Sequence, residues 1–110
     1  MLYFSQRRRL RAVVDYQLEM IILTIYESRS PTIEERKAVS RVSLMFQDFA
    51  NPKYASVPDQ GYLSECLAVL GESTPQAKKI SEIAALLDQH PSVWFEKLLK
   101  LEEEMNRGTK

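Results

Sequence analysis

Four of the five prolines stand directly behind or close to a residue that can cap a helix, and this pattern constrains the fold more than any other feature. The four are Pro31, Pro58, Pro75 and Pro91. Proline is tolerated in the first turn of a helix, where a backbone N–H has no intrahelical acceptor, so these positions predict four helix starts. Pro52 follows Asn51 and indicates a turn, in a longer loop that Tyr54 and Val57 are expected to pin to the core.

With an N-terminal helix added, these starts predict five helices, over residues 5–28, 31–50, 58–70, 75–89 and 92–107. Apolar residues recur at steps of three or four in four of them, as amphipathic helices require. Thr32 and Glu35 have the spacing of a capping box, and Gly71 is a natural C-terminal stop. The sequence therefore predicts an all-α fold, a compact bundle or small array whose consecutive helices are mostly antiparallel.

Length and composition indicate a single globular domain covering residues 1–110. The chain is 45% hydrophobic and 27% charged, and its formal net charge is zero. Its longest apolar stretch, residues 20–25, is far shorter than the roughly twenty residues of a membrane span. Cys66, the single cysteine, excludes an internal disulfide, and no secretory signal precedes the first helix. We expect an intracellular protein, cytoplasmic or nuclear, that does not bind a membrane.

The reactive side chains predict a protein that is not an enzyme. The chain has one histidine, His90, and one cysteine, Cys66. Cys66 is expected to be a core residue, and His90 to cap the carbonyl end of the helix over residues 75–89. No Cys or His pair has metal-ligand spacing, and no glycine-rich phosphate loop is present. We therefore expect no metal, no cofactor and no small-molecule substrate.

Two motif interpretations of residues 58–90 are disfavoured. A helix-turn-helix would use Lys78 and Lys79 on its second helix, but the segment carries five acids against these two lysines, whereas DNA binding depends on phosphate neutralisation. A tetratricopeptide repeat has about this length, but Leu67, Lys79 and Leu86 fall where the repeat needs small residues. An ordinary helical hairpin is the preferred interpretation.

Arg7, Arg8, Arg9 and Arg11 form the strongest local charge feature. A helix N-terminus prefers anions, so four arginines in the first two turns oppose the local rule. Only Arg11 has an obvious partner in sequence, Asp15 one turn on. The cluster is either a patch for nucleic acid or an acidic protein surface, or a solvated first turn. A further alternative is that the acidic residues 102–104 meet it, within the fold or between two copies.

The first helix carries more apolar surface than packing against one neighbouring helix requires. Apolar residues at 20, 21, 22, 23, 25 and 26 occupy most of its circumference, and such a helix needs cover on all sides. Either this helix is central and wrapped by the others, or it lies at an edge and a partner covers its outer side. The run could form a strand on local propensity, but no second strand-like segment offers it a partner.

These features predict a protein-interaction module, a subunit, adaptor or regulator that binds another protein or itself through an apolar helix surface flanked by the arginine cluster. Trp94 and Phe95 are candidate anchors on the last helix, with core packing as their alternative. The alternative function is nucleic-acid binding, with the arginines and Lys78 and Lys79 on phosphates. The predicted partner-binding residues are Arg7, Arg8, Arg9, Arg11, Val13, Met20, Leu23, Tyr26, Trp94 and Phe95.

Overall fold

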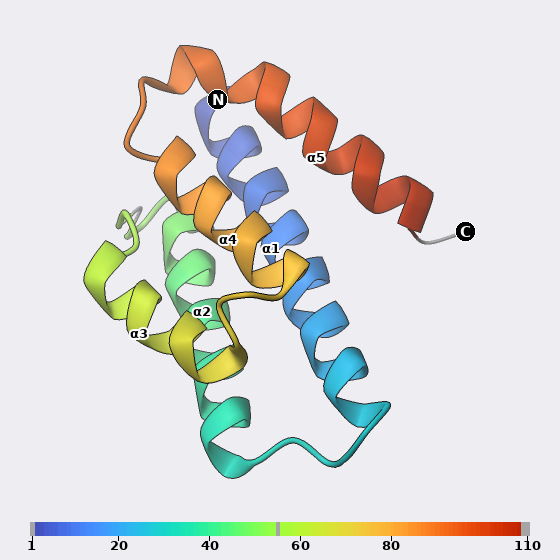
Figure 1. Ribbon diagram of the computed structural model, residues 1–110. Helices are drawn as coiled ribbons and strands as arrows, with labels where there is room; N and C mark the ends of the chain where they lie inside the picture. Colours follow the sequence, from blue (N-terminus) through green and yellow to red (C-terminus); the bar gives the residue numbers. More distant parts are fainter. Residues whose placement is uncertain (1, 55, 109–110) are drawn as a thin grey trace.

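The computed structural model describes the backbone of residues 2–54 and 56–108 and, residue 55 apart, the side chains of residues 5–107. Within this part of the chain there are five α-helices, one 3-10 turn and no strand (Figure 1). The all-α prediction is confirmed. The elements are α1 (Leu2–Tyr26), α2 (Ile33–Ala50), α3 (Gln60–Leu70), α4 (Pro75–Leu86), η1 (Pro91–Val93) and α5 (Trp94–Gly108).

Capping side chains set where the helices begin. The hydroxyl of Thr32 accepts a hydrogen bond from the backbone N–H of Glu35 at 3.1 Å, and the Glu35 carboxylate accepts one from the N–H of Thr32 at 2.8 Å. This is the predicted capping box, and it starts α2 two residues after Pro31. Asp59 caps α3 and Thr74 caps α4, each through a side-chain oxygen that accepts a hydrogen bond from the backbone N–H three residues further on. Each side chain satisfies an N–H that the helix itself leaves without an acceptor.

Of three predictions about the ends of helices and the loop after α2, two are wrong and one is confirmed. His90 does not cap α4, because its Nδ1 accepts a hydrogen bond from the N–H of Ser92 and so caps the turn that follows. Tyr54 and Val57 do not pin the loop after α2, since both are exposed and Pro58 is buried in their place. Gly71 does end α3, with a φ of +94° that L side chains rarely adopt.

The helices form a slab about two helices thick. α1 and α2 run side by side in opposite directions, α3 and α4 also run in opposite directions, and α5 crosses the upper part of α1 (Figure 1). α1 packs against α2, α4 and α5, while α3 packs against α2 and α4. The shortest dimension of the molecule is 21 Å, which holds two helices of about 10–12 Å diameter. A slab this thin leaves an open side on the helices in each layer.

The core lies between the layers, and α1 is not covered all round. Leu10, Val14, Leu18 and Ile21 are buried, but the apolar run at the end of α1 is not enclosed. Only Ile21 is buried within residues 20–26; Met20, Ile22 and Ile25 are half-buried, and Leu23, Thr24 and Tyr26 are exposed. Of the two arrangements predicted for this helix, the fully wrapped one is therefore wrong, because the second layer covers only one side of it.

An ion pair closes the connection between α1 and α2. The guanidinium of Arg29 donates two hydrogen bonds, at 2.7 and 2.8 Å, to the carboxylate of Glu35. These bonds, with the one from the N–H of Thr32, hold the pKa of Glu35 at about 2, below its ordinary 4.5. A carboxylate whose pKa is lower in the folded than in the unfolded state stabilises the fold when it is ionised.

We therefore expect Glu35 to make the protein acid-sensitive. Its stabilising contribution is complete above about pH 4.5 and is lost as the pH falls toward about 2. In Glu35→Gln, which keeps a side chain able to form a capping box, the free energy of unfolding should be lower at neutral pH and should fall less steeply over this interval. Urea unfolding measured at several pH values checks this. Equal slopes in the two proteins would assign the acid sensitivity to other carboxylates.

Candidate functional site

An open surface with exposed apolar side chains lies on α1 and α2, on the side facing away from α3 and α4. We call it the α1–α2 face. Each helix buries one stripe toward the second layer and presents the opposite stripe on this face. The face is made by Glu19, Ile22, Leu23 and Tyr26 of α1 and by Ile33, Arg36, Lys37, Val39, Ser40 and Leu44 of α2. Arg41 lies on the α3 side of α2, with its guanidinium 5.9 Å from the centre of the Tyr62 ring.

On α1, the exposed stripe changes character along the helix. Arg8 is exposed near the beginning, Glu19 in the middle, and Leu23 and Tyr26 at the end, where these two residues are 50% and 52% exposed. Two of the three residues predicted here, Leu23 and Tyr26, therefore lie on the open surface, and Met20 is half-buried. The apolar end of this stripe is therefore open to solvent.

The stripe on α2 was not foreseen from the sequence. Ile33 and Leu44 are 70% and 57% exposed, and between them lies a shallow hollow of about 300 Å³ bordered by Arg36, Lys37 and Arg41. These three cations form no ion pair with any residue whose side chain the structure describes. The spacing of residues 33, 37, 40 and 44, at steps of four, three and four, was a signal that could have revealed the stripe.

A groove of about 340 Å³ separates the two stripes. Leu18 and Ile22 of α1 and Val39 of α2 line it, with the acidic Asp15 and Glu19 along its α1 side. The hydroxyl of Ser43 donates to the Asp15 carboxylate at 3.5 Å across the helix pair. Burial raises the pKa of Asp15, although the Arg11 guanidinium, 3.5 Å away, opposes the shift. The groove thus combines apolar walls with an acidic edge.

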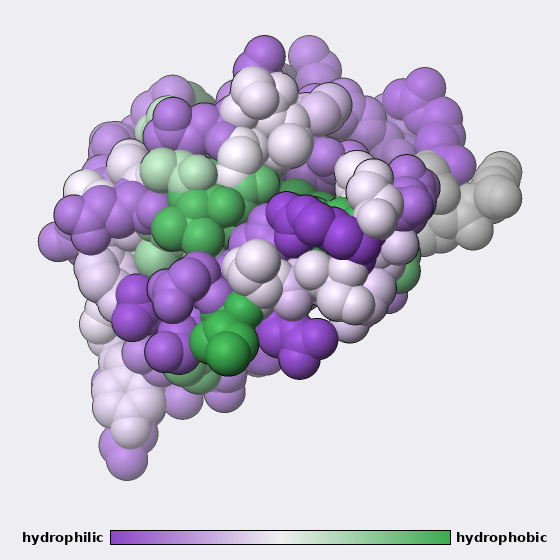
Figure 2. Space-filling model, turned by 60° about the horizontal axis from the view of Figure 1, so that its bottom comes forward, coloured by the Kyte–Doolittle hydropathy of each residue, from purple (hydrophilic) through white to green (hydrophobic). Residues whose placement is uncertain are grey.

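The end of the molecule that carries the α1–α2 connection also combines apolar and charged side chains. In Figure 2 this end faces the viewer, and hydrophobic side chains reach the surface as separate patches among hydrophilic ones. Large apolar side chains are normally exposed singly, so a set gathered on one face of two helices is the more informative feature.

The arginine cluster is dispersed by the fold. Arg7 is buried, its guanidinium 4.4 Å from the centre of the Phe49 ring and donating to the Phe49 carbonyl at 3.2 Å. The prediction that Arg7 is a surface contact is therefore wrong, because the antiparallel α2 ends beside it. Of the four arginines only Arg8 is exposed, whereas Arg11 pairs with Asp15 as predicted.

Arg9 meets the acidic end of the chain within one molecule. Its Nε donates to a carboxylate oxygen of Glu102 on α5 at 2.9 Å, and this pairing raises the pKa of Arg9. One of the two arrangements considered for the acidic residues 102–104 is therefore present. Glu104 pairs in turn with Lys79 of α4 at 2.7 Å. These two ion pairs fasten α5 to α1 on one flank and to α4 on the other.

Two predicted contact residues belong to the core. Val13 has no exposed surface, and Trp94 is 2% exposed, with its indole Nε1–H donating to the Gln89 carbonyl at 3.1 Å. Their prediction as partner contacts is wrong, because α5 packs over the first half of α1. Phe95, the neighbour of Trp94, is exposed, with the Arg9 guanidinium 5.6 Å from its ring centre.

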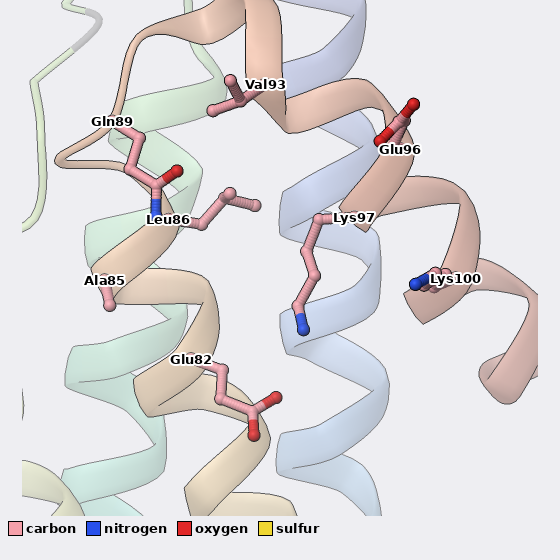
Figure 3. A pocket seen from close by; sticks show the side chains of 8 residues that line it. All are labelled: Glu82, Ala85, Leu86, Gln89, Val93, Glu96, Lys97 and Lys100. Carbon is pink, nitrogen blue, oxygen red and sulfur yellow. The ribbon is translucent and has the colours of Figure 1, made fainter.

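A hollow of about 410 Å³ lies where α4 and α5 diverge (Figure 3). Leu86 and Val93 form its apolar part, and Glu82 projects from α4 toward the side on which Lys97 and Lys100 stand. The hollow contains charges of both signs and neither a cysteine nor a histidine.

Candidate catalytic and metal-binding groups are not gathered elsewhere in the described part of the chain. Cys66 is buried on α3, and burial raises the pKa of its thiol. The hollow that it lines, about 190 Å³ between α2 and α3, does not include His90. No group of three His, Cys, Asp or Glu side chains could hold a metal ion among the described residues. Nor is any described helix long and apolar enough to cross a membrane.

Comparison of the chain with protein-family models, with curated proteins and with solved structures found no match.

Proposed function

We propose that this protein is a non-enzymatic interaction module that binds a protein partner through the α1–α2 face. The observation that carries the proposal is that Leu23 and Tyr26 of α1 and Ile33 and Leu44 of α2, two helices packed side by side, are all about half exposed or more. Side chains of this size lose water favourably when a partner covers them, at about 25 cal/mol per Å². Exposed apolar surface of this kind marks contact sites on other proteins.

The charges on the face define the chemistry of the partner. Glu19 borders the groove on the α1 side, and Arg36, Lys37 and Arg41 border the hollow on α2. A matching surface carries a basic group opposite Glu19 and acidic groups opposite the α2 cations, with apolar side chains between them. Complementary charges of this type fix the register of two surfaces and exclude wrong partners.

Nucleic-acid binding is the weaker of the two proposals. Arg9 and Lys79, two of the cations it requires, are engaged by Glu102 and Glu104, and Arg7 is buried against Phe49. Arg11 pairs with Asp15, and the remaining candidates, Arg8 and Lys78, lie on different helices. Phosphate binding draws its affinity from several free cations acting together, and few of the predicted ones are free here.

A selection from a random peptide library tests the proposed module. Peptides selected on the wild-type protein should share an apolar residue flanked by charge, and they should bind Leu23→Lys and Leu44→Lys at least tenfold more weakly. Lysine on either helix removes apolar contact area, and both positions are exposed enough to keep the fold intact. Fluorescence anisotropy measures the affinities.

The matched control is Leu99→Lys, which changes a similarly exposed leucine on α5, away from the α1–α2 face. This variant should bind the selected peptides like wild type. Peptides that lose affinity for the Leu99 variant and not for the other two, or a selection without enrichment, would refute the proposal.

A further inference from the structure

We infer that the protein that covers the α1–α2 face is a second copy of this chain. The inference rests on the proposed function and adds the identity of the partner. Its basis is that the two halves of the face carry opposite charges, with α1 acidic beside the groove and α2 basic beside its hollow. A surface whose two halves complement each other can pair with itself about a two-fold axis.

The contact between Asp15 and Ser43 fixes how the two helices are aligned. Because α1 and α2 are antiparallel, each turn forward along α1 corresponds to one turn back along α2. Glu19 therefore lies level with Val39, within one turn of Arg36. Tyr26 lies level with the start of α2, where Ile33 is exposed.

A two-fold axis parallel to these helices keeps every residue at its level and places α1 of one copy over α2 of the other. Glu19 then faces Arg36 of the second copy, and Tyr26 faces its Ile33. Since the axis repeats each contact, the pair of Glu19 with Arg36 occurs twice in the dimer. The four helices form an antiparallel arrangement of the kind that four-helix bundles use.

Two further observations favour self-association over a different partner. The formal net charge of the chain is zero, so two copies approach without overall repulsion. Three acidic side chains of α5 are not alternatives to Glu19, because Glu102, Glu103 and Glu104 pair with Arg9, Arg107 and Lys79 inside the same molecule. Glu19 pairs with no residue whose side chain the structure describes.

A charge-exchange experiment tests this pairing by sedimentation equilibrium. Wild-type protein is expected to dimerise reversibly. Glu19→Arg and Arg36→Glu should each raise the dimer dissociation constant at least tenfold, because each places like charges opposite one another. An equimolar mixture of the two variants should dimerise like wild type. In the mixed dimer the arginine introduced by the first substitution meets the glutamate introduced by the second, and the unchanged Glu19 of one copy meets the unchanged Arg36 of the other.

The mixture is decisive because no change within one molecule can produce a gain on mixing. Glu96→Arg on α5 and Lys78→Glu on α4 are the charge-matched controls and should dimerise like wild type. A wild-type protein that is monomeric at every soluble concentration overturns the inference, as does a dimer that the two variants leave intact or a mixture that stays monomeric. If the wild-type protein is monomeric but still binds the selected peptides, only the dimer inference is overturned. If it is monomeric and the library yields no binding peptide, both proposals are overturned.

Discussion

Trp94→Ala is expected to lower the free energy of unfolding by about 3–5 kcal/mol, the range typical of large aromatic residues removed from a core. The Trp94 ring lies 6.1 Å from that of Phe49, between centres, and fastens the beginning of α5 to the end of α2. Its removal leaves a cavity that the surrounding helices close only in part, and it frees the Gln89 carbonyl. A loss of this size is a large part of the total stability of a small domain, which is about 5–15 kcal/mol. We therefore expect α5 to be held less firmly against the other helices.

Urea unfolding followed by far-UV circular dichroism measures the loss. The control is Phe95→Ala, which removes a large aromatic side chain one position away that is exposed and contacts Arg9. That variant should cost less than about 1 kcal/mol. Comparable losses in the two variants would contradict the assignment of Trp94 to the core and Phe95 to the surface.

Arg7→Ala is expected to cost about 2–3 kcal/mol, far more than a surface arginine. The Arg7 guanidinium donates to the Phe49 carbonyl, one of the last four in α2, which find no N–H donor inside the helix. It also covers the Phe49 ring and places a positive charge at the negative end of α2. Alanine removes all three contributions and leaves a buried carbonyl without its donor.

Arg8→Ala provides the comparison, because Arg8 is exposed one position away. Its stability should stay within about 0.5 kcal/mol of wild type. Thermal unfolding of both variants under the same conditions measures the difference. Equal stabilities would mean that Arg7 is a solvated surface residue, as the sequence allowed.

The helices themselves could be predicted because their signals are local. Thr32 with Glu35, Thr74 before Pro75, and Gly71 after α3 act on backbone groups within a few residues of themselves, and the structure has each of them in the expected role. The error in the start of α3 has a local cause as well. The predicted start at Pro58 is two residues early because the Asp59 side chain caps α3.

The roles of the arginines could not be predicted, because they depend on which helix end lies alongside. Arg7 opposes the local preference of α1 but fits the C-terminal end of α2, and the antiparallel packing of the two helices brings these ends together. Arg9 finds Glu102, 93 residues away along the chain. No sequence-local rule carries information over such a separation.

The sequence by itself determined the helical class, the caps and the presence of more apolar surface on residues 20–26 than one seam can bury. Only the tertiary structure decided which of these side chains are exposed to solvent. A slab two helices thick buries one side of α1 and α2 and leaves the opposite side to solvent, so Ile21 is enclosed while Leu23, Tyr26, Ile33 and Leu44 are not. The physical reason is that burial is a property of the layer a helix joins, and periodicity specifies only which residues share a side.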